Sequence, residues 1–238
     1  MFFRVRLHKV RNVSDVIIPN GCLLKQENKV ELIGFYGSDE THAMSAWTST
    51  SRNLTEEKLG RIPDLLKMLA VGTDGNSHGT PFEKSTLHFL VTTDVAVHIQ
   101  LLKHRIGVSI SAESARYKEL KEDKFHIPED WPDYWKLRLE EHTKDSNKLY
   151  HDCLNSMVNE YGMDKKRAKE TARYFRGYNS QITADISFNF RSFVHFLNLR
   201  SAPSAQKEIQ EIANRMLTIV IEDGRFKHSL AAFNINSK

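Results

Sequence analysis

The segment from Lys103 to Tyr117 reads KHRIGVSISAESARY and follows an apolar run with helical spacing. It combines three cations, one histidine, three serines, one carboxylate and three small residues. Cations and hydroxyls bind anions, and glycine or alanine lets the backbone approach a ligand closely. The composition therefore indicates a site for an anionic, planar ligand. The alternative is a helix end that collects cations because of the helix dipole, although this leaves the serines and Arg116 unexplained.

The chain of 238 residues can bury a substantial core, and its length fits one large domain or two small ones. A formal net charge of +4 is compatible with phosphate ligands but too small to indicate nucleic-acid binding by itself. Cys22 and Cys153 are far apart, which disfavours a disulfide framework or a zinc site. The sequence shows no signal peptide and no apolar run of membrane-spanning length, so we expect a soluble, cytoplasmic protein.

Apolar periodicity predicts one α/β domain over residues 1–238, with a large helical portion and no dividing linker. Strands are expected at residues 2–10, 29–35, 85–92 and 181–190. Helices are expected at residues 40–49, 55–68, 95–103, 133–161, 164–175, 192–199 and 205–221. Asp39 is the expected N-cap of the first helix, and Pro63 is an objection to the second because a helix interior tolerates proline poorly. After Arg105 we expect a serine-rich loop.

Two further segments carry residues that suit a binding site. The loop SHGTPFE at residues 77–83 places a histidine and a threonine beside a glycine and a proline, where they can reach a polar ligand. An ordinary turn with a satisfied histidine is the alternative. Near the C-terminus, Arg191, His195 and Asn198 share one helical face because their spacing is i, i+4, i+7. An amphipathic helix with a solvated polar face is the alternative there.

Several familiar motifs are absent from the sequence. It lacks a GxGxxG segment after a strand, a P-loop, an HExxH pair and a GxSxG elbow. His88 and His98 lie in apolar runs, where a histidine is more often a core or interface residue than a metal ligand. No metal site is therefore predicted, and the three polar segments are the candidates for function.

Together, the three segments resemble the flavin-dependent thymidylate synthase family. The run that begins at His104 resembles the family signature Arg-His-Arg, spacer, Ser and Arg-Tyr, and HGTPFE at residues 78–83 resembles His-x-Thr-Pro-Phe-Glu. The third block, residues 171–209, contains AR, NFR and HFLNLR followed by AQKEI, in the order of the family's C-terminal pattern. Three features differ. Lys103 replaces the first arginine, and Arg176-Gly177 replaces Leu-Pro. The spacer from Arg105 to Ser114 is one residue longer, with Ser111 in place of the usual asparagine.

The resemblance implies a single α/β domain of the α+β type, with a mainly antiparallel, twisted sheet, that assembles as a homotetramer whose FAD sites combine several subunits. It implies reductive methylation of dUMP to dTMP, with methylenetetrahydrofolate as the carbon donor and NADPH as the reductant. Fixed cations would stabilise negative charge that develops on the uracil oxygens. The family uses no cysteine nucleophile, which agrees with the position of both cysteines outside the three blocks.

The resemblance also assigns residues by position. Those expected to line FAD are Ser49, His78, Thr80, Lys103, His104, Arg105, Asn189 and His195, with Glu113 as a further candidate. Those expected to hold dUMP are Gln100, Glu113, Ser114, Ala115, Arg116, Arg173 and Arg200. Ser114, Arg173 and Arg200 are the expected catalytic residues, and the division of the arginines between phosphate and uracil stays open. His195 would also border the folate site.

Two other functions stay open at this point. A related flavoenzyme that modifies another pyrimidine deoxynucleotide, such as dCMP, would suit the lengthened signature loop. A non-catalytic nucleic-acid-binding protein would use Arg105 and Arg116 with the basic run Lys165, Lys166 and Arg167. Only the enzymes require a bound flavin, so a flavin absorption spectrum separates them from the nucleic-acid-binding protein.

Overall fold

The fold is built around a four-stranded antiparallel sheet with the strand order β2-β3-β6-β4. The computed structural model describes residues 23–25, 27–51, 53–72 and 76–235. Within this part of the chain the sheet strands are β2 (Lys29–Tyr36), β3 (Thr86–Asp94), β4 (Val108–Ala112) and β6 (Gln181–Phe188). The strand predicted at residues 2–10 lies outside the described residues. The mixed fold and its antiparallel sheet are confirmed.

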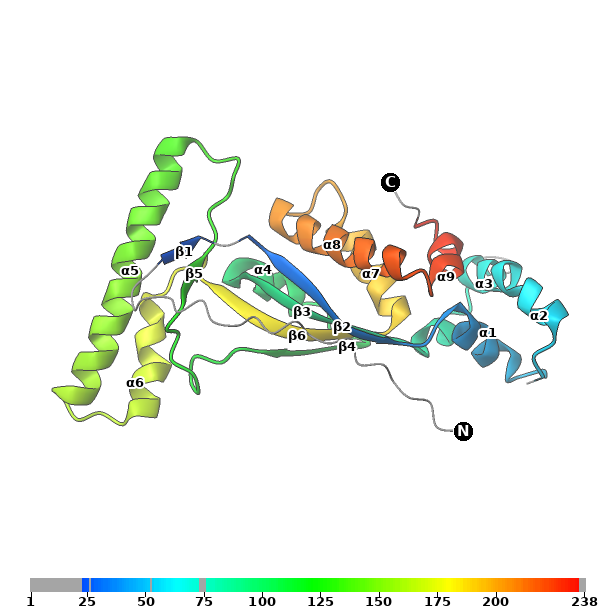
Figure 1. Cartoon of the computed structure of the whole chain (residues 1–238), viewed down its shortest axis with the longest axis horizontal. Helices are drawn as coiled ribbons and strands as arrows, with labels where there is room; N and C mark the ends of the chain where they lie inside the picture. The colour runs from blue at the N-terminus through cyan, green and yellow to red at the C-terminus, as the bar shows by residue number, and fades with distance from the viewer. Residues whose placement is uncertain (1–22, 26, 52, 73–75, 236–238) are drawn as a thin grey trace.

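Alternation of apolar and polar residues gives the two central strands one buried face. Phe89 of β3 lies opposite Ile186 of β6, and both side chains are fully buried. Helices α4 (Val95–Leu101), α7 (Phe190–Arg200) and α8 (Lys207–Asp223) cover this face (Figure 1). The buried residues that α7 and α8 supply to this core are Phe190, Phe193, Val194, Phe196, Leu197, Ile209, Ile212, Ala213, Met216 and Val220.

The serine-rich segment after Arg105 was predicted to be a loop, and this prediction is wrong. It forms the edge strand β4, in which Ile110 pairs with Ile186. Val108 and Ile110 pack against the core, whereas Ser109 and Ser111 are exposed. The serines therefore belong to an ordinary period-two strand pattern with one solvated face. High serine content concealed that pattern at the sequence level.

One end of the molecule is formed by the short helices α1 (Asp39–Trp47), α2 (Glu56–Gly60), α3 (Ile62–Val71) and α9 (Lys227–Ala232) (Figure 1). The single helix predicted at residues 55–68 is wrong, because the chain breaks after Gly60 and Pro63 lies in the first turn of α3, where proline is tolerated. The predicted N-cap of α1 is also wrong. Ser38 caps the helix by accepting from the Thr41 N–H, and Asp39 is buried instead.

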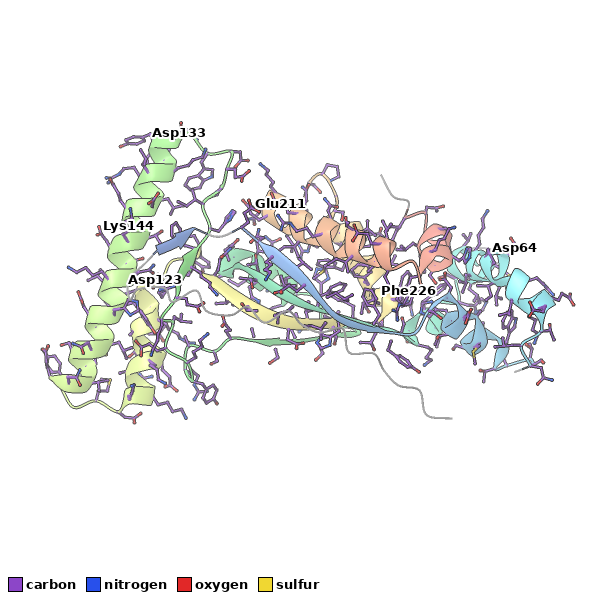
Figure 2. All side chains as sticks on the ribbon, viewed as in Figure 1. Asp64, Asp123, Asp133, Lys144, Glu211 and Phe226 are labelled. Carbon is purple, nitrogen blue, oxygen red and sulfur yellow. The ribbon has the colours of Figure 1, made fainter. Side chains whose placement is uncertain are left out.

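The opposite end contains the long helix α5 (Asp133–Asn159), α6 (Lys165–Ala172), the 3₁₀ turn η2 (Arg173–Phe175) and the parallel pair β1 (Leu23–Lys25) and β5 (Asp123–Phe125). Pro132 precedes α5, and Asp164 caps α6 by accepting from the Arg167 N–H. Arg176, one of the departures from the family pattern, forms a buried 2.6 Å ion pair with Asp123, which Figure 2 labels beside α5. None of the described helices is both long and apolar enough to cross a bilayer.

Candidate functional site

The first group of predicted ligand residues lies where β4 ends and η2 begins. Glu113, Ser114 and Ala115 line a cavity of about 570 Å³ together with Arg173. Glu113 is held on both oxygens, because Oε2 accepts from the Thr183 N–H at 3.0 Å and Oε1 accepts from Lys118 Nζ at 3.0 Å. Arg173 is exposed, and among the described residues its guanidinium has no ion-pair partner. This cavity therefore offers a cation and a hydroxyl to an anionic ligand.

The second group joins the end of α4 to the end of α7. Arg200 Nε donates to His104 Nε2 at 2.9 Å, and Arg200 Nη1 donates to Gln100 Oε1 at 3.0 Å. A guanidinium cannot accept, so His104 Nε2 must be the acceptor and its ring proton must lie on Nδ1. Burial, followed by the nearby charges of Arg200 and His195, lowers the pKa of His104 to about 4. Neutral His104 therefore holds the Arg200 guanidinium in one orientation.

This second group extends to two residues that were not predicted as site residues. Gln100 Nε2 donates to Gln206 Oε1 at 2.5 Å, and Gln206 Nε2 donates to Glu208 Oε2 at 2.8 Å. Glu208 is buried at the start of α8. The sequence did contain a signal, since Gln206 and Glu208 belong to the AQKEI run of the C-terminal block. The chain of bonds ties the side chain of Gln100 to α8 as well as to Arg200.

The third group surrounds the HGTPFE loop, whose last four residues form the 3₁₀ turn η1 (Thr80–Glu83). Ser49, His78 and Thr80 line one cavity of about 570 Å³, with Trp47, Leu65 and Leu69 among its apolar residues. The loop is anchored because Pro81 and Phe82 are buried and the His78 N–H donates to Leu69 O at 2.8 Å. Three residues separated in the sequence are therefore brought to one cavity.

The HGTPFE loop is also fixed from α7. A Cβ on Gly79 would lie 2.7 Å from Arg191 Nε, so a side chain there would force that guanidinium to shift. Arg191 in turn pairs with Glu83 at 2.8 Å. Arg191, His195 and Asn198 all lie on α7 and are exposed, which agrees with the alternative of a solvated polar face. One of its members, Arg191, holds the loop that carries His78 and Thr80.

Asn189 connects the signature segment to the start of α7. Its side chain caps the helix by accepting from the Ser192 N–H at 2.8 Å, and its backbone N–H donates to Gly107 O at 2.9 Å. Gly107 has a φ of +64°, a conformation that favours glycine. Beyond this turn, the exposed His195 lies beside His104, with ring centroids 6.2 Å apart. The turn therefore fixes the signature segment against the helix that carries His195 and Arg200.

Three of the predicted residues lie outside these groups: Lys103, Arg105 and Arg116. Arg116 points to α6, where its Nε donates to Glu170 at 2.7 Å. Lys103 and Arg105 are exposed, and among the described residues neither side chain has a hydrogen bond or an ion pair. Glu170 also pairs with Arg167 at 3.5 Å, so part of the basic run on α6 is neutralised. This pairing weakens the case for a nucleic-acid surface.

Taken together, the antiparallel fold brings predicted residues to two cavities, one that includes Arg173 and one that includes His78. Residues 31–223 match the model of the family described as thymidylate synthase complementing protein, and the chain belongs to that family. A flavin-dependent thymidylate synthase of Thermosipho melanesiensis is 30% identical over 81% of this chain and 85% of its own length. One from Streptomyces coelicolor is 26% identical over 90% of this chain and 94% of its own. The family resemblance inferred from the sequence is thereby confirmed.

The fold also has a close counterpart among solved structures. The UMP/dUMP methylase PolB from Streptomyces cacaoi, bound with 5-Br dUMP, superposes with a TM-score of 0.72 at 23% identity. The superposition covers 90% of this chain and 97% of PolB. At this identity the similarity concerns the fold, and it extends over nearly all of both chains.

Proposed function

We propose that this protein is a flavin-dependent thymidylate synthase that adds a methyl group to C5 of dUMP. One observation carries the proposal: the cavity that joins Ser114 and Ala115 of the signature segment to Arg173 of the C-terminal block. Residues from two of the blocks that identify the family thus line one cavity. Their cation and hydroxyl can bind the oxygens of a nucleotide's phosphate or uracil. Membership of the family supports the same conclusion.

The overall reaction converts dUMP, methylenetetrahydrofolate, NADPH and one proton into dTMP, tetrahydrofolate and NADP. The chemistry that FAD supplies when bound is transfer of a hydride that originates in NADPH. The chain itself would bind the nucleotide, orient the uracil and stabilise the enolate-like negative charge that develops on the uracil oxygens when a hydride adds to C6, which makes C5 nucleophilic. Neither cysteine is needed for these tasks.

The nucleotide would be held by groups from both sides of the reaction centre. The Ser114 hydroxyl, the Ala115 N–H and the Arg173 guanidinium offer hydrogen bonds to phosphate or uracil oxygens. Arg200 is the better ordered of the two arginines, because His104 and Gln100 fix it with bonds of 2.9 Å and 3.0 Å. A cation that is already oriented stabilises developing charge without reorganising during the reaction.

The residues around the HGTPFE loop are chemically suited to FAD. The cavity of about 570 Å³ falls within the roughly 300–1,000 Å³ of typical ligand pockets. Trp47, Leu65 and Leu69 offer an apolar wall to a flat ring, while Ser49, His78 and Thr80 offer hydrogen bonds to its polar edge. We assign these three polar residues to FAD, together with the half-buried Asn189 and the exposed Lys103, Arg105 and His195.

We also propose a homotetramer in which subunits share each site. Arg200 bonds to both Gln100 and His104, whereas Ser114 and Arg173 line a separate cavity. A nucleotide that contacts both groups would therefore draw them from two copies of the chain. The sheet supports this arrangement, because the described helices cover one of its faces and leave Ser109, Ser111 and Asp185 exposed on the other.

The experiment that tests the proposed function starts with the absorption spectrum of the purified protein. We expect the bands of oxidised flavin, their bleaching by NADPH, and formation of dTMP when dUMP and methylenetetrahydrofolate are present. Failure to take up supplied FAD would overturn the proposal. Turnover of dCMP in a parallel assay, without turnover of dUMP, would replace it with the related pyrimidine-modifying enzyme.

A second candidate function is methylation of UMP, favoured by the structural similarity to PolB, which is described as a UMP/dUMP methylase. The same assay separates the two, because the substrates differ only in the ribose 2′-hydroxyl. We expect a preference for dUMP of at least about tenfold in kcat/KM, the discrimination available from about 1.4 kcal/mol. Equal or faster turnover of UMP would favour the second candidate.

A further inference from the structure

A buried series of hydrogen bonds joins Asp39 and His42 of α1 to Ser229 of α9 and to Ser85, two residues after the HGTPFE loop. His42 Nε2 lies 2.9 Å from Ser85 Oγ, and His42 Nδ1 lies 2.9 Å from Ser229 Oγ. Ser229 Oγ lies 2.6 Å from Asp39 Oδ1. His42 and Ser229 have no solvent exposure, and Asp39 and Ser85 are also buried. The series joins three parts of the chain that are far apart in the sequence.

The direction of these bonds follows from proton counting. Both oxygens of Asp39 act as acceptors, since Oδ2 accepts from the backbone N–H of His228 at 2.7 Å and Oδ1 accepts from that of Ser229 at 2.8 Å. The single hydroxyl proton of Ser229 therefore goes to Asp39, and Ser229 accepts from His42 Nδ1–H. His42 Nε2 is left as an acceptor, so the Ser85 hydroxyl donates to it. Burial, which lowers the pKa of His42 to about 4, agrees with this neutral ring.

His42 lies directly behind the loop that carries His78 and Thr80. Its ring packs edge-on against Phe82 of η1 at 5.3 Å and stacks on Phe226 at 5.6 Å, and Phe226 is labelled in Figure 2. Ser85 is separated from the end of η1 by Lys84 alone. Arg191 holds the loop from the α7 side. On the core side, the bond from Ser85 to His42 adds to the anchoring by the buried Pro81 and Phe82.

The arrangement superficially resembles a serine nucleophile with a histidine base. Two observations oppose that interpretation. Ser85 is 4% exposed, which leaves little room for a reacting carbonyl. A catalytic base works best when its pKa lies near the operating pH, and burial lowers the pKa of His42 to about 4, well below neutral pH. The series of bonds is therefore suited to holding atoms in place and not to proton transfer.

We propose that His42 is a positioning residue for FAD binding, acting through Ser85 on the loop that carries His78 and Thr80, with Ser229 and Asp39 fixing its tautomer. The inference rests on the proposed function, because it assigns that loop to FAD. It makes a specific claim, namely that residues on α9 and α1 control the affinity of a site that they do not touch.

The first test measures FAD dissociation constants by quenching of flavin fluorescence. Ser85→Ala and Ser229→Ala should each weaken FAD binding by about five- to tenfold, the effect of one lost buried hydrogen bond. The double variant should be no weaker than Ser85→Ala, because both changes interrupt the same series. Ser146→Ala is the matched control, since Ser146 is equally buried but bonds within α5. Its FAD affinity should equal that of the wild type.

The second test replaces His42 with each of two amides. Gln reaches the position of Nε2 and can accept from Ser85, whereas Asn reaches the position of Nδ1 and can donate to Ser229. His42→Gln should therefore retain FAD affinity better than His42→Asn. Amide hydrogen exchange of residues 80–84, measured without FAD, should be faster in His42→Asn, Ser85→Ala and Ser229→Ala than in the wild type.

The outcomes separate this inference from the proposed function. A wild-type protein that does not bind FAD overturns both. Normal FAD binding by the wild type with unchanged affinities in Ser85→Ala and Ser229→Ala overturns the inference alone. Additive losses in the double variant, or better binding by His42→Asn than by His42→Gln, also contradict it.

Discussion

Arg200 shows how a single side chain is prepared for a role in the proposed reaction. Its guanidinium donates to a ring nitrogen, a side-chain carbonyl and the Gln100 backbone carbonyl at 3.3 Å. Three acceptors in fixed positions suit a planar fork of donors and do not suit a lysine ammonium. The neutral state of His104 is part of this arrangement, because a protonated ring would repel Arg200.

The first prediction concerns the oriented guanidinium of Arg200. Arg200→Lys keeps the charge but loses the orientation, so kcat/KM for dUMP should fall by roughly 10²–10³, the usual effect of removing one oriented group that stabilises developing charge. Steady-state kinetics checks this. Arg138→Lys is the control, because Arg138 pairs with Glu141 on the exposed surface of α5 and should leave kcat/KM unchanged. An active Arg200→Lys enzyme would remove Arg200 from the proposed machinery.

The second prediction concerns pH and follows from the lowered pKa of His104. Between about 4 and 6.5 the unfolded chain binds a proton that the folded ring excludes, so the free energy of unfolding should decrease as pH falls through this range. His104 contributes at most about 1.4 kcal/mol per pH unit. His104→Gln can still accept from Arg200 but does not titrate, so its denaturant-derived stability should decline less steeply. If the free energy of unfolding falls equally steeply with pH in the wild type and in His104→Gln, this assignment is contradicted.

At the scale of elements, the start of α7 is where the three sequence blocks meet. The Asn189 side chain caps the helix and its N–H bonds to Gly107 in the signature turn, while Arg191, two residues further on, holds the HGTPFE loop. Gly107 makes the approach possible, because a Cβ there would lie 2.2 Å from Asn189 Nδ2. A helix N-terminus thus fixes two loops that are 20 or more positions apart in the sequence.

The third prediction separates two costs at Gly107. Gly107→Ala places a side chain at a φ of +64° and drives its Cβ into Asn189. Gly162→Ala has the same conformational cost at a φ of +62°, and a Cβ there meets nothing within 4 Å. Denaturant unfolding should show a loss of about 1–2 kcal/mol for Gly162→Ala and about 1–3 kcal/mol more for Gly107→Ala. Equal losses would mean that the close approach to Asn189 is unimportant.

At the scale of the whole molecule, the candidate residues form separate groups on one chain. Arg173 belongs to the end that contains α5 and α6, whereas Arg200 lies where α4 and α7 end over the sheet. The chain encloses neither group, since Arg173 is exposed and Arg200 is half-buried. This distribution is the physical basis for proposing sites that are shared between subunits.

The fourth prediction tests that sharing directly. Arg173→Ala and Arg200→Ala should each be inactive, but their co-expression should restore about a quarter of wild-type activity, because random assembly places both intact arginines in one of four sites. Mixing the two purified proteins without exchange of subunits is the control and should restore nothing. Inactive co-expressed protein with the mass of a tetramer would show that each site is confined to one chain.

Several features could be predicted from the sequence because they depend on local rules. The strands β2, β3 and β6 and the long helix α5 follow from apolar periodicity, and the caps Asp94 and Asp164 follow from the hydrogen-bonding capacity of aspartate. The family follows from three blocks in order, and the family model confirms it. The individual ligand assignments and the tetramer remain predictions.

Other features depended on contacts that the sequence does not display. The pairing of Ile110 with Ile186 made a strand of the serine-rich segment, and the bonds from His228 and Ser229 drew Asp39 into the core so that Ser38 became the cap. Residues such as Lys103 to Tyr117 carry the chemistry of the site in their own side chains, so the sequence alone determined what kind of ligand they suit. Which of them share a cavity was decided only by the tertiary structure, because hydrogen bonds and packing act between residues that are close in space, however far apart they lie in the chain.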